Sequence, residues 1–118
     1  MAVGLNILQW IIVILVLINN KLKKQMNTFL KAQKAKDILT ELEKENPGFN
    51  LWTSISAQLN FILNDFDSSG NHKKDANKNR VDELILGVQS IREIEPGNPE
   101  LSELLCDINY EYKKLYDL

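Results

Sequence analysis

Residues 84–112 read LILGVQSIREIEPGNPELSELLCDINYEY, and the predicted fold is organised around this stretch. Its first half places Leu84, Val88 and Ile91 at helical spacing, with Ile85 alongside. Its second half repeats this apolar spacing at Leu101, Leu104, Leu105, Ile108 and Tyr112. Because apolar residues that recur every three or four positions form one stripe on a helix, each half is predicted to be an amphipathic helix.

A short hinge separates the two predicted helices. Pro96 and Gly97 end the first one, Asn98 is suited to accept a hydrogen bond from a free N–H of the second, and Pro99 fits the first helical position. The stretch is therefore predicted to be a helical hairpin. Such a hairpin cannot bury both of its stripes by itself, so the preceding chain must supply helices that cover them.

The preceding chain contains two further amphipathic patterns. One occupies 27–45 and the other 51–66, and the turn residues Asn46, Pro47 and Gly48 separate them. The first pattern has its apolar face at Phe29, Ala32, Ala35, Ile38, Leu39 and Leu42, and the second at Leu51, Ile55, Leu59, Ile62, Leu63 and Phe66. Trp52 and Phe61 flank the second stripe.

A polar stretch, Ser68–Asn79, follows and is predicted to be a flexible surface loop, after which Arg80 begins the third helix. These patterns predict an all-α domain over residues 26–118. The domain is predicted to be a small four-helix bundle at about residues 27–116. A separate N-terminal segment, residues 1–25, is predicted to add an apolar helix.

The N-terminal segment allows two interpretations. Residues 2–18 are apolar except for Gly4, Asn6 and Gln9. The length of this run is at the lower limit for a helix that spans a bilayer. The lysines at positions 21, 23 and 24 follow this run, which favours a membrane anchor whose C-terminal side is cytoplasmic. Alternatively, Met26 is the true start, and residues 1–25 are an over-extension of the working protein.

Charge and cysteine content exclude some classes of protein. The 118 residues carry a net charge of −2, but the part from Met26 onward holds 11 basic and 16 acidic residues, a balance of −5. A nucleic-acid partner is not expected, because phosphate neutralisation needs a clustered excess of Lys and Arg. A basic protein partner suits this charge better. The single cysteine, Cys106, cannot form an internal disulfide, which fits a reducing compartment.

Metal ligation and cofactor binding are not expected either. Residues 65–70, DFDSSG, open like a calcium loop, but Ala76 stands where the closing glutamate is needed and Lys73 occupies another ligand position. A solvated turn is therefore predicted at Asp65. The only histidine, His72, has no cysteine or second histidine near it in sequence, so no metal site is expected there.

Acidic side chains surround the hinge and raise the question of catalysis. They form a predicted acidic rim of Glu93, Glu95, Glu100, Glu103 and Asp107. A general acid or base needs a concave pocket beside it, and the sequence offers no phosphate-binding glycine loop and no nucleophile with its base. Cys106 lies next to the apolar stripe, where cysteine is usually a packing residue. The chain is therefore not expected to be an enzyme.

The combined pattern resembles a known family, the small helical immunity proteins of the bacterial type VI secretion system. More closely, it resembles those that neutralise effectors with NAD(P)+ glycohydrolase activity. The resemblance covers nearly all of Met26–Tyr110. It is carried by Pro47-Gly48-Phe49, Ser54, Gln58-Leu59, Phe61-Ile62, Leu86-Gly87, Ile91, Glu93, Pro99-Glu100-Leu101-Ser102, Leu105, Asp107 and Tyr110.

The resemblance implies a stoichiometric inhibitor, without a cofactor, that binds a cognate toxin and protects the producing cell. It would work in the cytoplasm, with or without a tether to the inner membrane through residues 2–18. The toxin-binding residues predicted are Glu93, Glu95, Glu100, Asp107 and Trp52, although Trp52 also fits core packing. An alternative function, a membrane-anchored adaptor that recruits a cytosolic protein, and a homo-oligomeric state both stay open.

Overall fold

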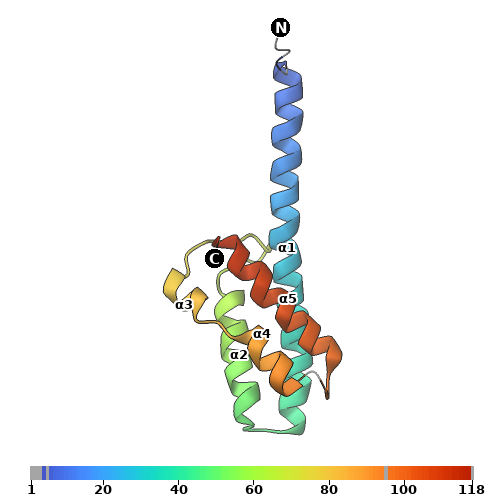
Figure 1. The fold of residues 1–118 in the computed structure, drawn as a ribbon, viewed down its shortest axis with the longest axis vertical. Helices are drawn as coiled ribbons and strands as arrows, with labels where there is room; N and C mark the ends of the chain where they lie inside the picture. The colour runs from blue at the N-terminus through green and yellow to red at the C-terminus, as the bar shows by residue number, and fades with distance from the viewer. Residues whose placement is uncertain (1–3, 5, 95, 118) are drawn as a thin grey trace.

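The computed structural model describes residues 4, 6–94 and 96–117, and within them it confirms the all-α prediction (Figure 1). Its only β-type pairing there is an isolated bridge between Phe66 and His72. The helices are α1 (Ile7–Glu45), α2 (Asn50–Leu63), α3 (Lys78–Asp82), α4 (Leu86–Gln89), the π-helix η1 (Ser90–Ile94) and α5 (Pro99–Leu115).

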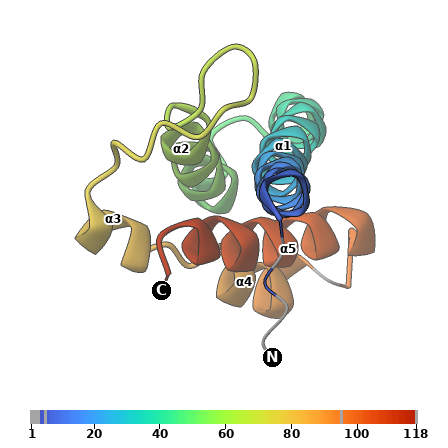
Figure 2. The same cartoon turned by 90° about the horizontal axis from the view of Figure 1, so that it is seen from above.

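Helix α5 lies at the centre of the arrangement. Figure 2 shows α1 and α2 on one side of α5 and α4 on the other, so α5 separates α4 from α1. The core lies between these helices. Its fully buried large side chains include Leu39 of α1, Ile55, Leu59 and Ile62 of α2, Leu86 of α4, and Leu101, Leu105, Ile108 and Tyr112 of α5.

The hinge and α5 agree with the prediction. The Asn98 Oδ1 atom accepts a hydrogen bond from the backbone N–H of Leu101 at 3.1 Å, and Pro99 is the first helical residue. This satisfies one of the donors that a helix start leaves free. The predicted stripe of α5 faces the core, where Leu104 is half-buried and its other members are fully buried.

The predicted third helix is wrong in its continuity and in its buried face. The chain forms α3, leaves the helical conformation around Glu83–Ile85, and forms a second helix from Leu86. Val88 and Ile91, predicted as core, are 51% and 61% exposed. The break has a packing reason: Leu84 and Leu86 are two residues apart and point in nearly opposite directions on one helix, whereas the break allows both to be buried.

The N-terminal apolar segment and the first helix of the bundle form one continuous helix of 39 residues, α1. The helix begins with a reciprocal cap: Asn6 Oδ1 accepts the Gln9 N–H at 2.8 Å, and Gln9 Oε1 accepts the Asn6 N–H at 2.9 Å. Residues 7–24 project beyond the other helices and are exposed throughout (Figure 1). Among the described residues, no helix combines the length and the hydropathy that crossing a membrane requires.

A chain that starts at Lys23 is expected to keep its helical fold and to melt within a few degrees of the full chain. The reason is that the first buried residues of α1 are Gln25 and Thr28, so the deleted part contributes no core contact. Circular dichroism during thermal unfolding measures this. Loss of cooperative melting in this truncation would show that the projecting segment belongs to the folding unit.

The matched control is a chain that starts at Phe29, which should be clearly less stable. It lacks Gln25, whose Oε1 accepts the His72 N–H at 3.3 Å. It also lacks Met26, which packs tightly on Gly70: a Cβ at this glycine would lie 2.9 Å from the Met26 sulfur.

Candidate functional site

A buried carboxylate, Asp65, joins the end of α2 to the end of α5. Its Oδ2 atom accepts hydrogen bonds from the Tyr112 hydroxyl at 2.8 Å and the Tyr116 hydroxyl at 2.5 Å, and lies 2.6 Å from His72 Nε2. Its Oδ1 accepts the backbone N–H of Asp75 at 3.0 Å. The carboxylate is therefore the common partner of four groups from two other parts of the chain, the loop at 72–75 and the end of α5 at 112–116.

Burial and hydrogen bonding oppose each other at this cluster. Burial acts to raise the pKa of Asp65, but the hydrogen bonds from Tyr116 and Tyr112 outweigh it, so the pKa lies below its ordinary value. Burial lowers the pKa of His72 more than the contact with Asp65 raises it. The cluster therefore holds an ionised carboxylate beside a neutral imidazole at neutral pH.

The prediction of a solvated turn at Asp65 is wrong, and the loop at 68–79, although mostly exposed as predicted, holds one buried side chain, that of His72. Asp65 is 4% exposed, and the His72 side chain is completely buried. Nothing in the sequence around Asp65 or His72 signals this cluster, because the partners Tyr112 and Tyr116 are 47 and 51 residues away from Asp65. Because the imidazole is inaccessible to solvent, a substrate could not reach the Asp65–His72 pair.

The same cluster explains why Asp65 is not placed to begin a calcium loop. Its carboxylate oxygens are occupied by protein donors, and Asp67, the next ligand position, accepts the backbone N–H groups of Ser69 and Asn71. In the part of the chain that the structure describes, no three His, Cys, Asp or Glu side chains gather closely enough to hold a metal ion.

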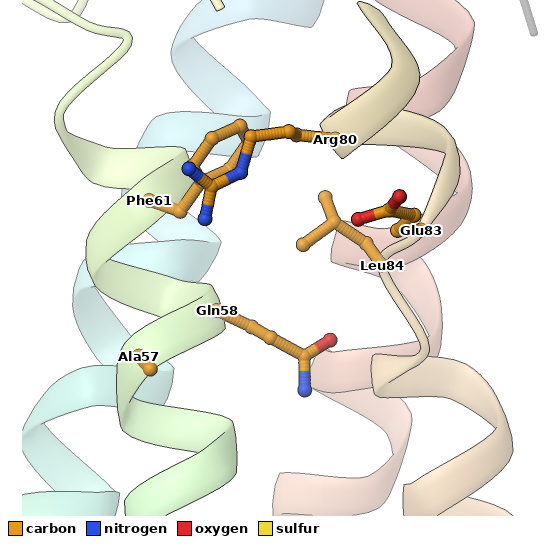
Figure 3. A pocket seen from close by; sticks show the side chains of 6 residues that line it. All are labelled: Ala57, Gln58, Phe61, Arg80, Glu83 and Leu84. Atoms are coloured by element: carbon orange, nitrogen blue, oxygen red, sulfur yellow. The ribbon is translucent and has the colours of Figure 1, made fainter. Parts of the chain in front are cut away.

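A small open pocket of about 190 Å³ lies between α2 and α3 (Figure 3). The Arg80 guanidinium lies over the Phe61 ring, 5.6 Å from its centroid, a cation–π contact that joins the two helices. Phe61 packs half-buried on the core, as predicted. The other residues that line the pocket are Ala57, Gln58, Glu83 and Leu84. This set offers packing and charge but no nucleophile with a base.

Gln58 holds α4 against α2. Its Oε1 accepts the backbone N–H of Ile85 at 2.8 Å, and its Nε2 donates to Gln89 Oε1 at 2.7 Å. Gln89 Nε2 in turn donates to the Ser54 hydroxyl at 3.0 Å. These hydrogen bonds cross from one helix to the other and fix the orientation of α4 at its start and its end.

A second set of polar contacts holds the following π-helix against α5. The buried Ser90 hydroxyl lies 3.3 Å from the Ser102 carbonyl oxygen and 3.1 Å from the Cys106 sulfur. Cys106 is therefore a packing residue, as predicted from its place beside the apolar stripe. Its sulfur also lies 3.9 Å from the Gly87 carbonyl oxygen, within reach of a weak hydrogen bond.

With its inner side fixed in this way, α4–η1 presents three apolar side chains outward, which we call the outer stripe: Ile85, Val88 and Ile91. They are spaced three residues apart and are 48%, 51% and 61% exposed. Near this surface, Phe49 (49% exposed) lines an open cavity of about 430 Å³ together with Gln89 and Glu93. Sequence reasoning missed this surface because the same residues read as a core stripe.

The predicted acidic rim does not gather at one place. Glu100 pairs with Lys34 at 2.9 Å and Asp107 with Lys31 at 3.3 Å, so both face α1. Glu93 instead lines the cavity near the start of α2. Glu95, also predicted to bind the toxin, lies outside the described residues.

Trp52 is half-buried and meets the ring of Phe49 edge-on, with the ring centroids 5.4 Å apart. The indole of Trp52 therefore packs against the core and also contacts the exposed ring of Phe49.

One protein family, Tsi6, has a sequence model that matches residues 31–114. The chain belongs to the Tsi6 family. Members of this family are type VI secretion immunity proteins, so the coarser part of the sequence-based resemblance is confirmed. Searches of curated proteins and of solved structures find no match to the chain.

The Tsi6 match begins inside α1 and covers the other helices, so it excludes the projecting part of α1. Several of the motif residues that carried the resemblance have structural explanations here. Pro47 and Gly48 form the turn between α1 and α2, where Gly48 has a φ of 77°, a conformation that favours glycine. Gly87 adjoins the α5 contacts, and Pro99 and Leu101 begin α5. Tyr110 is 65% exposed, with the Lys114 ammonium 5.5 Å from its ring centroid.

Proposed function

We propose that this Tsi6-family protein binds a cognate secreted antibacterial toxin and blocks its activity, and that the toxin is an NAD(P)+ glycohydrolase. The observation that carries the proposal is the family match, which spans residues 31–114 and therefore all of α2, α3, α4 and η1, the second part of α1 and nearly all of α5. The class of toxin rests on the closer resemblance of the motif residues. An immunity protein of this kind protects the cell that makes the toxin.

The charge of the helical domain supports such a partner. From Met26 onward it carries 11 basic and 16 acidic residues. An enzyme that binds NAD(P)+ needs positive potential for the phosphates, and an acidic protein complements such a cleft and accelerates the encounter with it. The protein thus acts by occupying the toxin and not by turning over a substrate. We place this activity in the cytoplasm, where the toxin would meet NAD(P)+.

The purified protein is expected to form a stable complex with its cognate effector, whose gene we expect beside its own, and to suppress the NAD(P)+ hydrolysis of this effector at near-equal molar ratio. By itself it should hydrolyse no NAD(P)+. Size-exclusion chromatography of the mixture and a nicotinamide-release assay measure the two effects. Suppression that requires a large excess would contradict tight stoichiometric inhibition.

Two other outcomes separate the parts of the proposal. If the effector is bound but consumes no NAD(P)+ in the absence of this protein, the immunity function stands and the class of toxin is wrong. If the protein neither binds nor inhibits the effector, the immunity function itself fails. The adaptor alternative, which stays a prediction, requires a partner whose activity need not change on binding.

A further inference from the structure

We infer that the toxin docks on the outer stripe of α4–η1 together with Phe49 and Glu93. This inference rests on the proposed function, because it names the surface through which that function operates. The surface differs from the predicted acidic rim, of which it keeps only Glu93.

The first observation is that α4–η1 is apolar on two sides. Its inner side buries Leu86 (0% exposed) and Ile94 (2% exposed) against the core. Its outer side leaves the outer stripe about half-exposed. Residues three apart are neighbours on a helix surface, so Val88 and Ile91 form a small exposed apolar patch, and such a patch is typical of an interaction site. The fold covers only one side of this helix, so a partner is expected on the other.

The second observation is that the surface is held in place before any partner arrives. The hydrogen bonds from Gln58 to the Ile85 N–H and to Gln89 fix α4 on α2. The Ser90 hydroxyl fixes η1 on α5 through the Ser102 carbonyl oxygen. A preorganised surface loses little conformational entropy on binding, which favours a tight complex. The π-helical conformation of η1 agrees with this, since such helices occur frequently at functional sites.

The third observation concerns what the surface can accept. The open cavity of about 430 Å³ lined by Phe49, Gln89 and Glu93 can take a protruding side chain. Glu93 places a carboxylate at this cavity, next to Arg92 in sequence, and the chain from Met26 onward carries 11 basic and 16 acidic residues. The complementary partner therefore presents apolar side chains surrounded by Lys or Arg.

A cationic toxin fits this description better than a second copy of the chain does. Two copies docked through this surface would bring their carboxylates together, and each domain already carries an excess of five negative charges from Met26 onward. Like charges facing each other across an interface oppose association. A toxin that binds NAD(P)+ supplies the opposite charge.

The test compares Val88→Glu and Ile91→Glu with Leu30→Glu in the full chain. Leu30 is a matched control: it is 52% exposed, like Val88 at 51%, but lies on α1, which α5 separates from α4 (Figure 2). Isothermal titration with the effector's toxin domain should show binding at least about 100-fold weaker for the two outer-stripe variants, because the new carboxylate must be desolvated in an apolar contact. The control should change the affinity less than about threefold, the size expected of a surface substitution away from the interface.

Thermal unfolding checks that each variant is folded, and Val88→Ser and Ile91→Ser provide milder changes in case a glutamate prevents folding. If the folded outer-stripe variants bind as tightly as the wild type, the docking surface is wrong while the proposed function stands. If the wild type does not bind the toxin domain, both proposals fail. If the wild type is a dimer in sedimentation that the outer-stripe variants convert to monomer without loss of toxin binding, a second copy occupies the surface and the inference is overturned.

Discussion

Replacing Leu105 by alanine is expected to lower the free energy of unfolding by about 2–5 kcal/mol. Leu105 is completely buried in the middle of α5, the helix that contacts both α1 and α4–η1. Removing most of its side chain loses apolar burial and leaves a cavity that the surrounding helices cannot fill. A small domain has about 5–15 kcal/mol of stability in total, so the loss should be plain in urea unfolding followed by circular dichroism.

Two variants on the same helix provide the comparison. Leu104→Ala should cost less than Leu105→Ala because its side chain is only half-buried. Asn98→Ala removes the N-cap hydrogen bond and should cost about 0.5–2 kcal/mol. Equal losses for all three variants would show that α5 does not bury the face described.

Replacing Asp65 by alanine is expected to cost on the order of 3 kcal/mol or more, because each buried donor left without an acceptor costs about 1–3 kcal/mol. The hydroxyl groups of Tyr112 and Tyr116 and the backbone N–H of Asp75 would all lose their acceptor. Tyr112→Phe removes one donor and leaves the carboxylate in place, so it should cost much less. Urea unfolding of the two variants measures the difference.

The pH dependence of stability provides a second measurement of the same cluster. The pKa of His72 is lower in the folded chain than its ordinary 6.5, so the unfolded chain binds a proton first as the pH falls below about 6.5. The stability that comes from keeping His72 neutral is therefore fully present above this pH and is lost progressively below it. The pKa of Asp65 is lowered from 3.8, so its contribution is present above that value and is lost as the pH falls through the folded pKa.

Both groups thus destabilise the fold on acidification, but in separate ranges. In His72→Gln, which keeps a side-chain N–H donor but does not titrate, the loss of stability between pH 7 and pH 5 should be smaller than in the wild type. Charged neighbours of the imidazole, Lys74 and Asp75, are unchanged in this variant. If the two proteins lose the same stability over this range, His72 is not the group that titrates.

The sequence alone determined the helices whose apolar period is unbroken. The stripes of α1, α2 and α5 face the core as predicted, because each lies on one side of a helix and buries in one direction. The start of α5 was equally predictable, since Asn98 and Pro99 act on neighbouring backbone groups. Both features depend on interactions between residues that are close in sequence, so the sequence is sufficient to predict them.

The buried side of α4–η1, by contrast, depends on how the helices pack against one another. Val81, Leu84 and Leu86 are all buried, and no single helix face holds all three, so core packing broke the predicted helix and turned Val88 and Ile91 outward. The cluster at Asp65 was equally hidden, because its tyrosine partners come from the end of α5. The free energy of burying that carboxylate depends on donors from distant parts of the chain, and their proximity exists only in the folded protein.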